Sequence, residues 1–179
     1  MAGNTTLRVI PLGGLGEIGR NMMVMEYGDD IIVVDVGLMF PEEEMLGVDL
    51  VIPDFSYLRE NREKLRAVFL THGHEDHVGA LPYFMREFNV PIYGARLTDG
   101  LIRVKLQEHR LLQGAETHVV VPGEVITAGV FEVEFFPVAH SIPDACGLII
   151  RTPLGPVVHT GDFKLDHTPV MDQHTDLIR

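Results

Sequence analysis

The chain has 179 residues, of which 46% are hydrophobic and 22% are charged, a composition typical of one globular domain with a hydrophobic core. The formal net charge is −12, so the surface of the chain does not by itself attract RNA or DNA. A single cysteine, Cys146, excludes a disulfide within the chain. No signal-type N-terminus or apolar run of about 18 residues occurs, so we expect a cytoplasmic protein without a membrane span.

The first predicted elements surround a glycine-rich loop. Residues 7–12 read as a strand, and residues 14–19 follow with the spacing G-x-G-x-x-G. An acid, Asp35, lies about 20 residues after the first of these glycines. This combination is the fingerprint of a dinucleotide-binding turn. A crossover helix of a dozen or more residues does not fit before the apolar strand at residues 31–35. Residues 21–27 have strand composition, so we predict an antiparallel hairpin and reject a dehydrogenase. The loop is expected to lie close to another feature, such as a metal site.

The most informative stretch is residues 72–77, which place three histidines and two acids within six positions. Residues 40–54 read as a loop and 55–66 as a short helix. The apolar strand at residues 67–70 leads into the cluster, and residues 78–88 have helical spacing with Pro82 in an early turn. The side chains of the cluster can therefore converge on one point. Imidazole and carboxylate together suit Zn²⁺ or a similar divalent ion.

The second half of the chain predicts one helix and a β-rich region. Residues 90–93 read as a brief strand. Residues 97–112 predict an amphipathic helix whose apolar positions include Leu97, Leu101, Val104 and Leu111. Five further strands are predicted between turn signals, at residues 118–121, 124–126, 131–138, 147–152 and 155–160.

Two of these strand ends carry candidate ligands. His140 follows one strand, and Asp162 follows the next strand but one. Together with the cluster they supply four histidines and two aspartates, enough for two metal ions that share one carboxylate. His159 is expected to be packed or hydrogen-bonded within its strand, whereas four histidines show no ligand pattern: His109, His118, His167 and His174.

The order of these motifs resembles the metallo-β-lactamase superfamily over essentially the whole chain and, within it, the ribonuclease J family of the β-CASP branch. The histidine cluster at residues 72–77 has the spacing H-x-H-x-D-H, which alone identifies only the superfamily. The branch rests on the strings at residues 11–21, 40–43, 47–49, 71–79, 93–98, 140–144 and 159–164. The resemblance implies an α/β fold, the αββα sandwich with metals at one edge between the sheets. This chain would be its N-terminal part, without the β-CASP insertion, the second half of the metal-binding domain and the C-terminal domain.

The resemblance also implies a site with two divalent ions, zinc as the expected metal and manganese as the alternative. The first ion would be held by His72, His74 and His140, the second by Asp76 and His77, and Asp162 would bridge the two.

Three acids would be catalytic by the same resemblance: Asp35, Asp76 and Asp162. Asp35 ends a strand, where a carboxylate can orient a ligand histidine, although it could also be an ordinary turn acid. Ser141 would face substrate, unless it is only a turn hydroxyl.

The implied function is a metal-dependent ribonuclease that hydrolyses RNA phosphodiesters, endonucleolytically or in the 5′-to-3′ direction, in rRNA processing and RNA decay. RNA would bind mostly to the missing domains, the complete enzyme could be a homo-oligomer, and the isolated chain would be inactive. Two alternatives stay open. One is another hydrolase of this fold acting on a thioester, lactone or lactam, and the other is a chain with no activity of its own.

Overall fold

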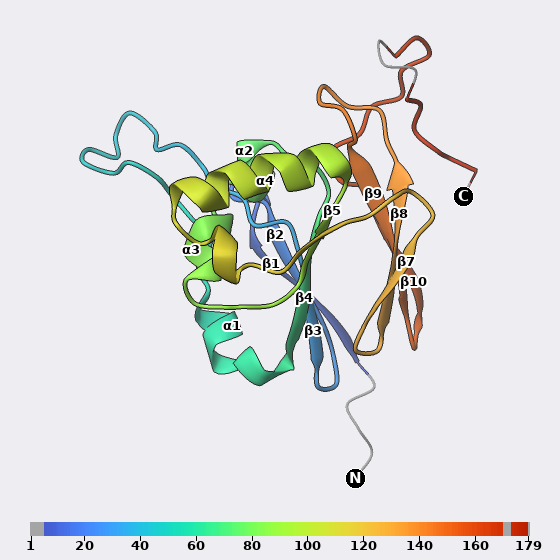
Figure 1. Cartoon of the computed structure of the whole chain (residues 1–179), viewed down its shortest axis with the longest axis horizontal. Coiled ribbons are helices and arrows are strands. Elements are labelled where there is room, and N and C mark those ends of the chain that lie inside the picture. Colours follow the sequence, from blue (N-terminus) through green and yellow to red (C-terminus); the bar gives the residue numbers. More distant parts are fainter. Residues whose placement is uncertain (1–5, 170–172, 179) are drawn as a thin grey trace.

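The computed structural model describes residues 6–169 and 173–178. Two β-sheets pack face to face, and the helices of the described residues cover the outer face of the first sheet (Figure 1). Within the described part of the chain, no helix has the length and apolar character that a bilayer crossing requires.

The first sheet has six strands in chain order, from β1 at one edge to β6 at the other. Its strands are Leu7–Gly13 (β1), Met22–Tyr27 (β2), Asp30–Val34 (β3), Leu65–Leu70 (β4), Ile92–Gly94 (β5) and Thr117–Val119 (β6). The pairings β1–β2 and β2–β3 are antiparallel, which confirms the predicted hairpin, and the remaining three are parallel. Parallel strands end at the same edge, so the residues that follow β3 and β4 meet there.

Helical segments connect the parallel strands and lie on one face of this sheet (Figure 1). The helices are Ser56–Glu60 (α1), Glu75–Val78 (α2), Leu81–Met85 (α3) and Arg96–Glu108 (α4), with short 3-10 helices at Arg62–Lys64 and Leu112–Gly114.

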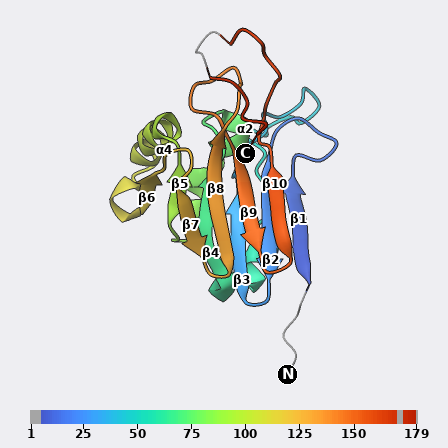
Figure 2. The same cartoon turned by 90° about the vertical axis from the view of Figure 1, so that its right-hand side faces the viewer.

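The second sheet is antiparallel, in the order β10-β9-β8-β7. Its strands are Val125–Ala128 (β7), Phe131–Pro137 (β8), Cys146–Thr152 (β9) and Gly155–His159 (β10). Figure 2 looks onto its outer face, which no helix of the described residues covers. The described chain therefore shows the layers α, β and β of the predicted αββα sandwich.

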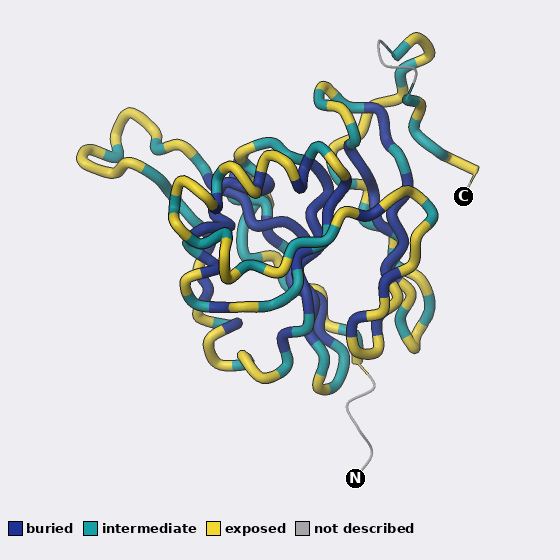
Figure 3. Tube along the Cα trace, in the orientation of Figure 1, coloured by how far each residue is buried: buried dark blue, intermediate teal, exposed yellow. Residues whose placement is uncertain are grey.

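The first sheet is buried on both faces, which β3 shows most directly. Ile31 and Val33 pack in the core under the helices, whereas Ile32 and Val34 pack in the core between the sheets. The dark-blue strands at the centre of Figure 3 follow this arrangement. A strand covered on both sides needs apolar residues at every position, which explains its unbroken hydrophobic sequence.

The helix predicted at residues 78–88 is confined to α3, because α2 precedes it and ends at Val78. The peptide nitrogen of Ala80 donates to the Val36 carbonyl at 3.0 Å, so the chain turns toward β3 after α2. Pro82 has no N–H to continue the ladder and lies in the first turn of α3. The helix predicted at residues 55–66 is likewise only α1 and a 3-10 turn, because β4 already begins at Leu65.

The predicted apolar face of the helix at residues 97–112 is wrong in register. The helix ends at Glu108, and its buried row includes Ile102 and Leu106, four residues apart, while Leu101 and Val104 are exposed. A Cβ at Gly73 would lie 2.5 Å from Leu101 Cδ1, so Leu101 covers the histidine turn rather than the core.

Candidate metal centre

The predicted ligands come together at the edge where β3, β4, β8 and β10 end. His72 and His74 follow β4, and His140 follows β8. His72 Nε2 lies 3.0 Å from His74 Nδ1, and His140 Nε2 lies 3.3 Å from the same atom. The three rings therefore form a cluster whose nitrogen atoms face one another.

A second cluster contains His72, His77 and Asp162, with ligand atoms within 4.8 Å of one another. Asp162 also reaches the first cluster, because its Oδ1 is 3.5 Å from His77 Nε2 and its Oδ2 is 3.8 Å from His140 Nε2. One carboxylate thus presents one oxygen to each cluster, an arrangement compatible with a bridging ligand.

A glycine allows Asp162 to reach this position. Gly161 has a φ of +56°, and a Cβ there would lie 2.8 Å from the Cys146 carbonyl oxygen and 3.1 Å from Thr71 Cβ. Any other residue would meet both a backbone conformation that favours glycine and a close contact with the neighbouring segments.

Asp76 lies at the margin of the second cluster. Its Oδ2 is 3.6 Å from His77 Nε2, and its side chain is 36% exposed. The same oxygen accepts a 3.2 Å hydrogen bond from Asn21 Nδ2. Asp76 is thus close to the other predicted ligands but less enclosed than His72 or His77.

Asp35 is buried behind the predicted ligands and is hydrogen-bonded to one of them, His77, and to Thr71. Its Oδ2 accepts hydrogen bonds from His77 Nδ1 and from the Thr71 hydroxyl, both at 2.8 Å, and its Oδ1 accepts from the Thr71 peptide nitrogen. The φ of Asp35 is +59°, a left-handed conformation that aspartate tolerates better than most residues. The strand-end position predicted from sequence is therefore correct.

Thr71 was not predicted as part of the site. Its Oγ1 donates to Asp35 and lies 3.0 Å from His72 Nδ1, from which it can accept a hydrogen bond. The only local sign was a hydroxyl residue between the apolar strand and the first histidine. Because Nδ1 of His72 faces Thr71, only Nε2 is free, so His72 can serve one ion.

Burial and neighbouring charges separate the protonation states of the ligands. Burial and the charge of His77 lower the pKa of His72 to about 3. Burial also acts to lower the pKa of His77, but the Asp35 and Asp162 carboxylates outweigh it and raise that pKa to about 10. The hydrogen bond from His77 lowers the pKa of Asp162 to about 2. Imidazole nitrogens and carboxylate oxygens form a donor set that fits a divalent cation such as zinc, although His77 must first lose a proton.

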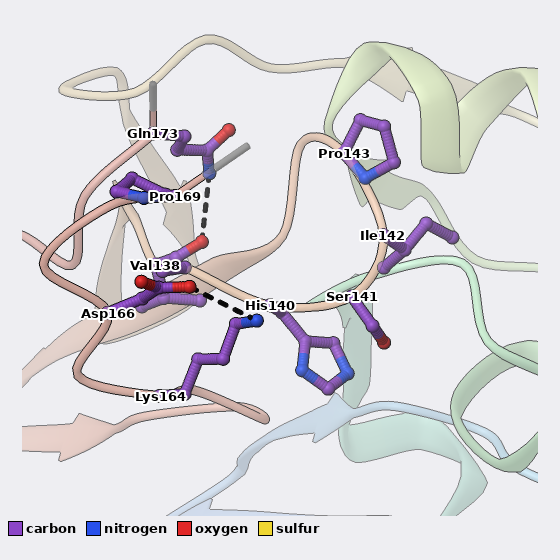
Figure 4. Close-up of a pocket in the computed structure, with 10 residues that line it drawn as sticks. Val138, His140, Ser141, Ile142, Pro143, Lys164, Asp166, Pro169 and Gln173 are labelled. Atoms are coloured by element: carbon purple, nitrogen blue, oxygen red, sulfur yellow. Dashed lines mark hydrogen bonds and ion pairs between the residues drawn. The ribbon is translucent and has the colours of Figure 1, made fainter. Parts of the chain in front are cut away.

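Two cavities flank the clusters. One, of about 350 Å³, lies beside His140 and Ser141 and is shown in Figure 4, where Lys164 pairs with Asp166 at 3.4 Å. The exposed Ser141 borders this cavity, next to His140.

The other cavity, of about 400 Å³, is bordered by the first glycines of the loop and by His77, His159 and Asp162. The glycine-rich loop thus lies beside the ligand clusters, as predicted. His159 Nδ1 accepts a 3.2 Å hydrogen bond from the Gly161 peptide nitrogen, in agreement with its predicted structural role.

Residues 15–175 match the family model of the metallo-beta-lactamase superfamily. The chain is 50% identical over 182 residues to ribonuclease J of Synechocystis, a match that covers 99% of this chain and 28% of the relative. It is 54% identical over 171 residues to ribonuclease J of Thermus thermophilus, covering 92% of this chain and 30% of the relative. The chain therefore spans less than a third of the length of these relatives.

A solved structure supports the fold. The metallo-beta-lactamase fold protein YhfI from Bacillus subtilis superposes with a TM-score of 0.62 at 24% identity, covering 88% of this chain and 63% of that protein.

Proposed function

The chain belongs to the metallo-beta-lactamase superfamily, and from this premise we propose that it is the metal-binding part of a ribonuclease that hydrolyses RNA phosphodiester bonds. The observation that carries the proposal is the pair of ligand clusters, both of which Asp162 reaches. The 50% identity to a ribonuclease J over nearly the whole chain supports RNA as the substrate.

We assign two ions to this site, with zinc favoured by the histidine-rich donor set and manganese as the alternative. His72, His74 and His140 would hold the first ion, Asp76 and His77 the second, and Asp162 would bridge them. His72 goes to the first ion because its one free nitrogen, Nε2, lies 3.0 Å from His74 Nδ1, whereas His77 directs Nε2 toward Asp162 and Asp76.

Bound divalent ions would supply water with a pKa lowered from ~15.7 toward ~7 and would stabilise negative charge on the phosphoryl oxygens. The residues of the chain contribute orientation. Asp35 accepts the Nδ1 proton of His77 and so directs its Nε2 toward the site. Asp162 fixes the separation of the two clusters, and Ser141 borders the cavity through which we propose that substrate approaches.

The remaining implications of the resemblance are part of the same proposal. They are a cytoplasmic enzyme of rRNA processing and RNA decay, endonucleolytic or 5′-to-3′ exonucleolytic activity, and possible self-association. The net charge of −12 is consistent with an RNA-binding surface on further domains, including a β-CASP domain.

Metal titration of the 179-residue chain, followed by calorimetry, tests the proposal. Two tight sites are expected, and His74→Ala should remove one of them while the circular dichroism spectrum is retained. One weak site or none would contradict the proposal and favour a chain without enzymatic function.

The longest natural polypeptide that carries this sequence should then be assayed on 5′-monophosphorylated RNA and on thioester, lactone and lactam substrates. RNA cleavage that His74→Ala abolishes is the expected result. Turnover of the acyl substrates alone would assign the site to a different hydrolase.

A further inference from the structure

The glycine-rich loop at residues 13–19 has no part in the assignments above, yet it leads directly into the metal edge. It ends at Arg20 and Asn21, whose peptide nitrogens donate to the Leu38 carbonyl at 3.0 Å and to the Asp76 carbonyl at 2.9 Å. The loop is thus hydrogen-bonded both to the segment that follows β3 and to α2.

The segment after β3 completes this connection. Gly37 donates its N–H to the Asn21 carbonyl at 2.9 Å, and Val36 donates to the His77 carbonyl at 2.7 Å. A Cβ at Gly37 would lie 1.6 Å from the Asp76 carbonyl oxygen, so a glycine is required where these three segments meet. The carbonyl groups of Asp76 and His77 are therefore each held by a hydrogen bond, from Asn21 and from Val36.

The side chain of Asn21 extends the same contact to the ligand atoms. Its Nδ2 lies 3.2 Å from Asp76 Oδ2 and 3.1 Å from His77 Nε2. Asn21 itself is half-buried and borders the cavity that also contains His77 and Asp162. An amide nitrogen only donates, so its hydrogen bond goes to the Asp76 carboxylate, which only accepts.

Asp76 is the ligand that most needs such support. It lies in a helix of only four residues, its side chain is 36% exposed, and it lies outside both tight ligand clusters. A partly exposed carboxylate without a fixed partner loses rotamer freedom on binding a cation, which weakens that binding.

We propose that Asn21 is a positioning residue for the second metal ion, and that the glycine-rich loop serves to place its carboxamide against Asp76. The inference rests on the proposed function, because it requires an ion bound by Asp76 and His77. Asn21 acts through Asp76 rather than by contact with the reacting atoms. Hydrogen-bond partners of metal ligands commonly change metal affinity by about 10- to 100-fold.

The test is a double-mutant cycle on metal affinity, with Zn²⁺ or Mn²⁺ titrated into the full chain. Asn21→Ala should lower the affinity for one of the two ions by about tenfold and leave the affinity for the other unchanged. In an Asp76→Ala background, Asn21→Ala should have almost no further effect on the affinity for that ion. A merely structural role would instead weaken binding equally in both backgrounds.

Asn61→Ala is the matched control, because Asn61 also donates from its amide, to the Tyr57 carbonyl at 2.9 Å, in the α1 region. It should leave both affinities unchanged, and thermal melting of the metal-free variants should show that each is folded. Two tight sites in the wild type with unchanged affinities in Asn21→Ala would overturn this inference alone. Fewer than two sites in the wild type would contradict the proposed function itself.

Discussion

Asp35 accepts a 2.8 Å hydrogen bond from His77 Nδ1, and the two side chains are only 2% and 3% exposed. Asp35 lies at the end of β3 and His77 in α2, so the bond joins two segments that are distant in the sequence. Burial acts to raise the pKa of Asp35, but the charge and hydrogen bond of His77, with smaller effects of His159 and the Thr71 peptide nitrogen, together outweigh it. That pKa is therefore lowered and the carboxylate is ionised. The pair therefore fixes the ring of His77, a proposed ligand, and joins α2 to the end of β3.

Asp35→Asn should weaken metal binding, because an amide nitrogen would then compete with His77 Nδ1–H and Thr71 Oγ1–H as a donor. We expect a loss of about 10- to 100-fold in affinity for the ion held by His77. Removal of one partner from a buried ion pair should also destabilise the metal-free chain by about 3 kcal/mol. Calorimetric titration and urea denaturation measure the two effects, and an Asp35→Asn chain with wild-type affinity would contradict this role.

Substitutions of Thr71 can test its hydroxyl separately from its shape. Valine keeps the shape of threonine and removes the hydroxyl, whereas serine keeps the hydroxyl. Thr71→Val leaves Asp35 Oδ2 without one donor and His72 Nδ1 without an acceptor, so it should destabilise the chain by about 1–3 kcal/mol. Thr71→Val should also lower the affinity for the ion assigned to His72. Thr71→Ser retains the hydroxyl and should retain most of the affinity. Equal affinities for the two variants would show that the hydroxyl does not orient His72.

The sequence predicted the site best where the information is local. The spacing of His72, His74 and His77 lies within one turn, and Asp35, His140 and Asp162 each follow an apolar strand. Strand ends on one edge converge once the sheets form, so these positions could be predicted without coordinates. A dinucleotide site was rejected because the chain between the glycines and β3 is too short for a crossover helix, and this too is local information.

The roles of Thr71 and Asn21 depend on distant partners and could not be predicted. Thr71 and Asn21 act through Asp35 and Asp76, which lie 36 and 55 residues away in the chain. The prediction of which face of α4 is buried was wrong for a similar reason. Leu101 has the apolar character of a core residue, but its neighbour is Gly73 in the histidine turn, a contact that periodicity alone does not reveal.

Metal binding should release a proton from His77. Its pKa is raised to about 10 in the metal-free chain, so at pH 7 Nε2 is protonated and must lose that proton to bind a cation. His72, with a pKa lowered to about 3, is already neutral at that pH. Affinity for the ion at His77 should therefore rise by about tenfold per pH unit from pH 7 toward 10.

Calorimetry in buffers of different ionisation enthalpy measures this proton release, which should approach one proton at pH 7. Release of no proton would show that His77 is neutral before the ion binds. Asp35→Asn provides an internal comparison, because loss of a carboxylate beside His77 should reduce the proton release.

A second buried carboxylate stabilises the opposite end of the first sheet. Glu26 in β2 is 3% exposed and pairs with Lys64 Nζ at 2.8 Å and Arg8 Nη1 at 3.0 Å, and it accepts a short hydrogen bond from the Tyr57 hydroxyl. Burial raises the pKa of Glu26, but the bonds from Lys64 and Tyr57 outweigh it, so that pKa is lowered. These contacts tie β1, β2 and the α1 region together.

Glu26→Gln should destabilise the chain by about 1.5–3 kcal/mol near neutral pH, because two cations lose their buried partner. The pKa of Glu26 is lower in the folded than in the unfolded chain, so its contribution is present above about pH 4.5 and lost as the pH falls through the folded pKa. The difference in urea stability between wild type and variant should therefore be constant above pH 4.5 and shrink below it.

Two controls accompany the Glu26→Gln variant. Its metal affinity should not change, and Glu116→Gln, which removes an exposed partner of His118, should have a much smaller effect on stability. A stability difference that persists undiminished into acid would show that Glu26 acts through packing rather than through its charge.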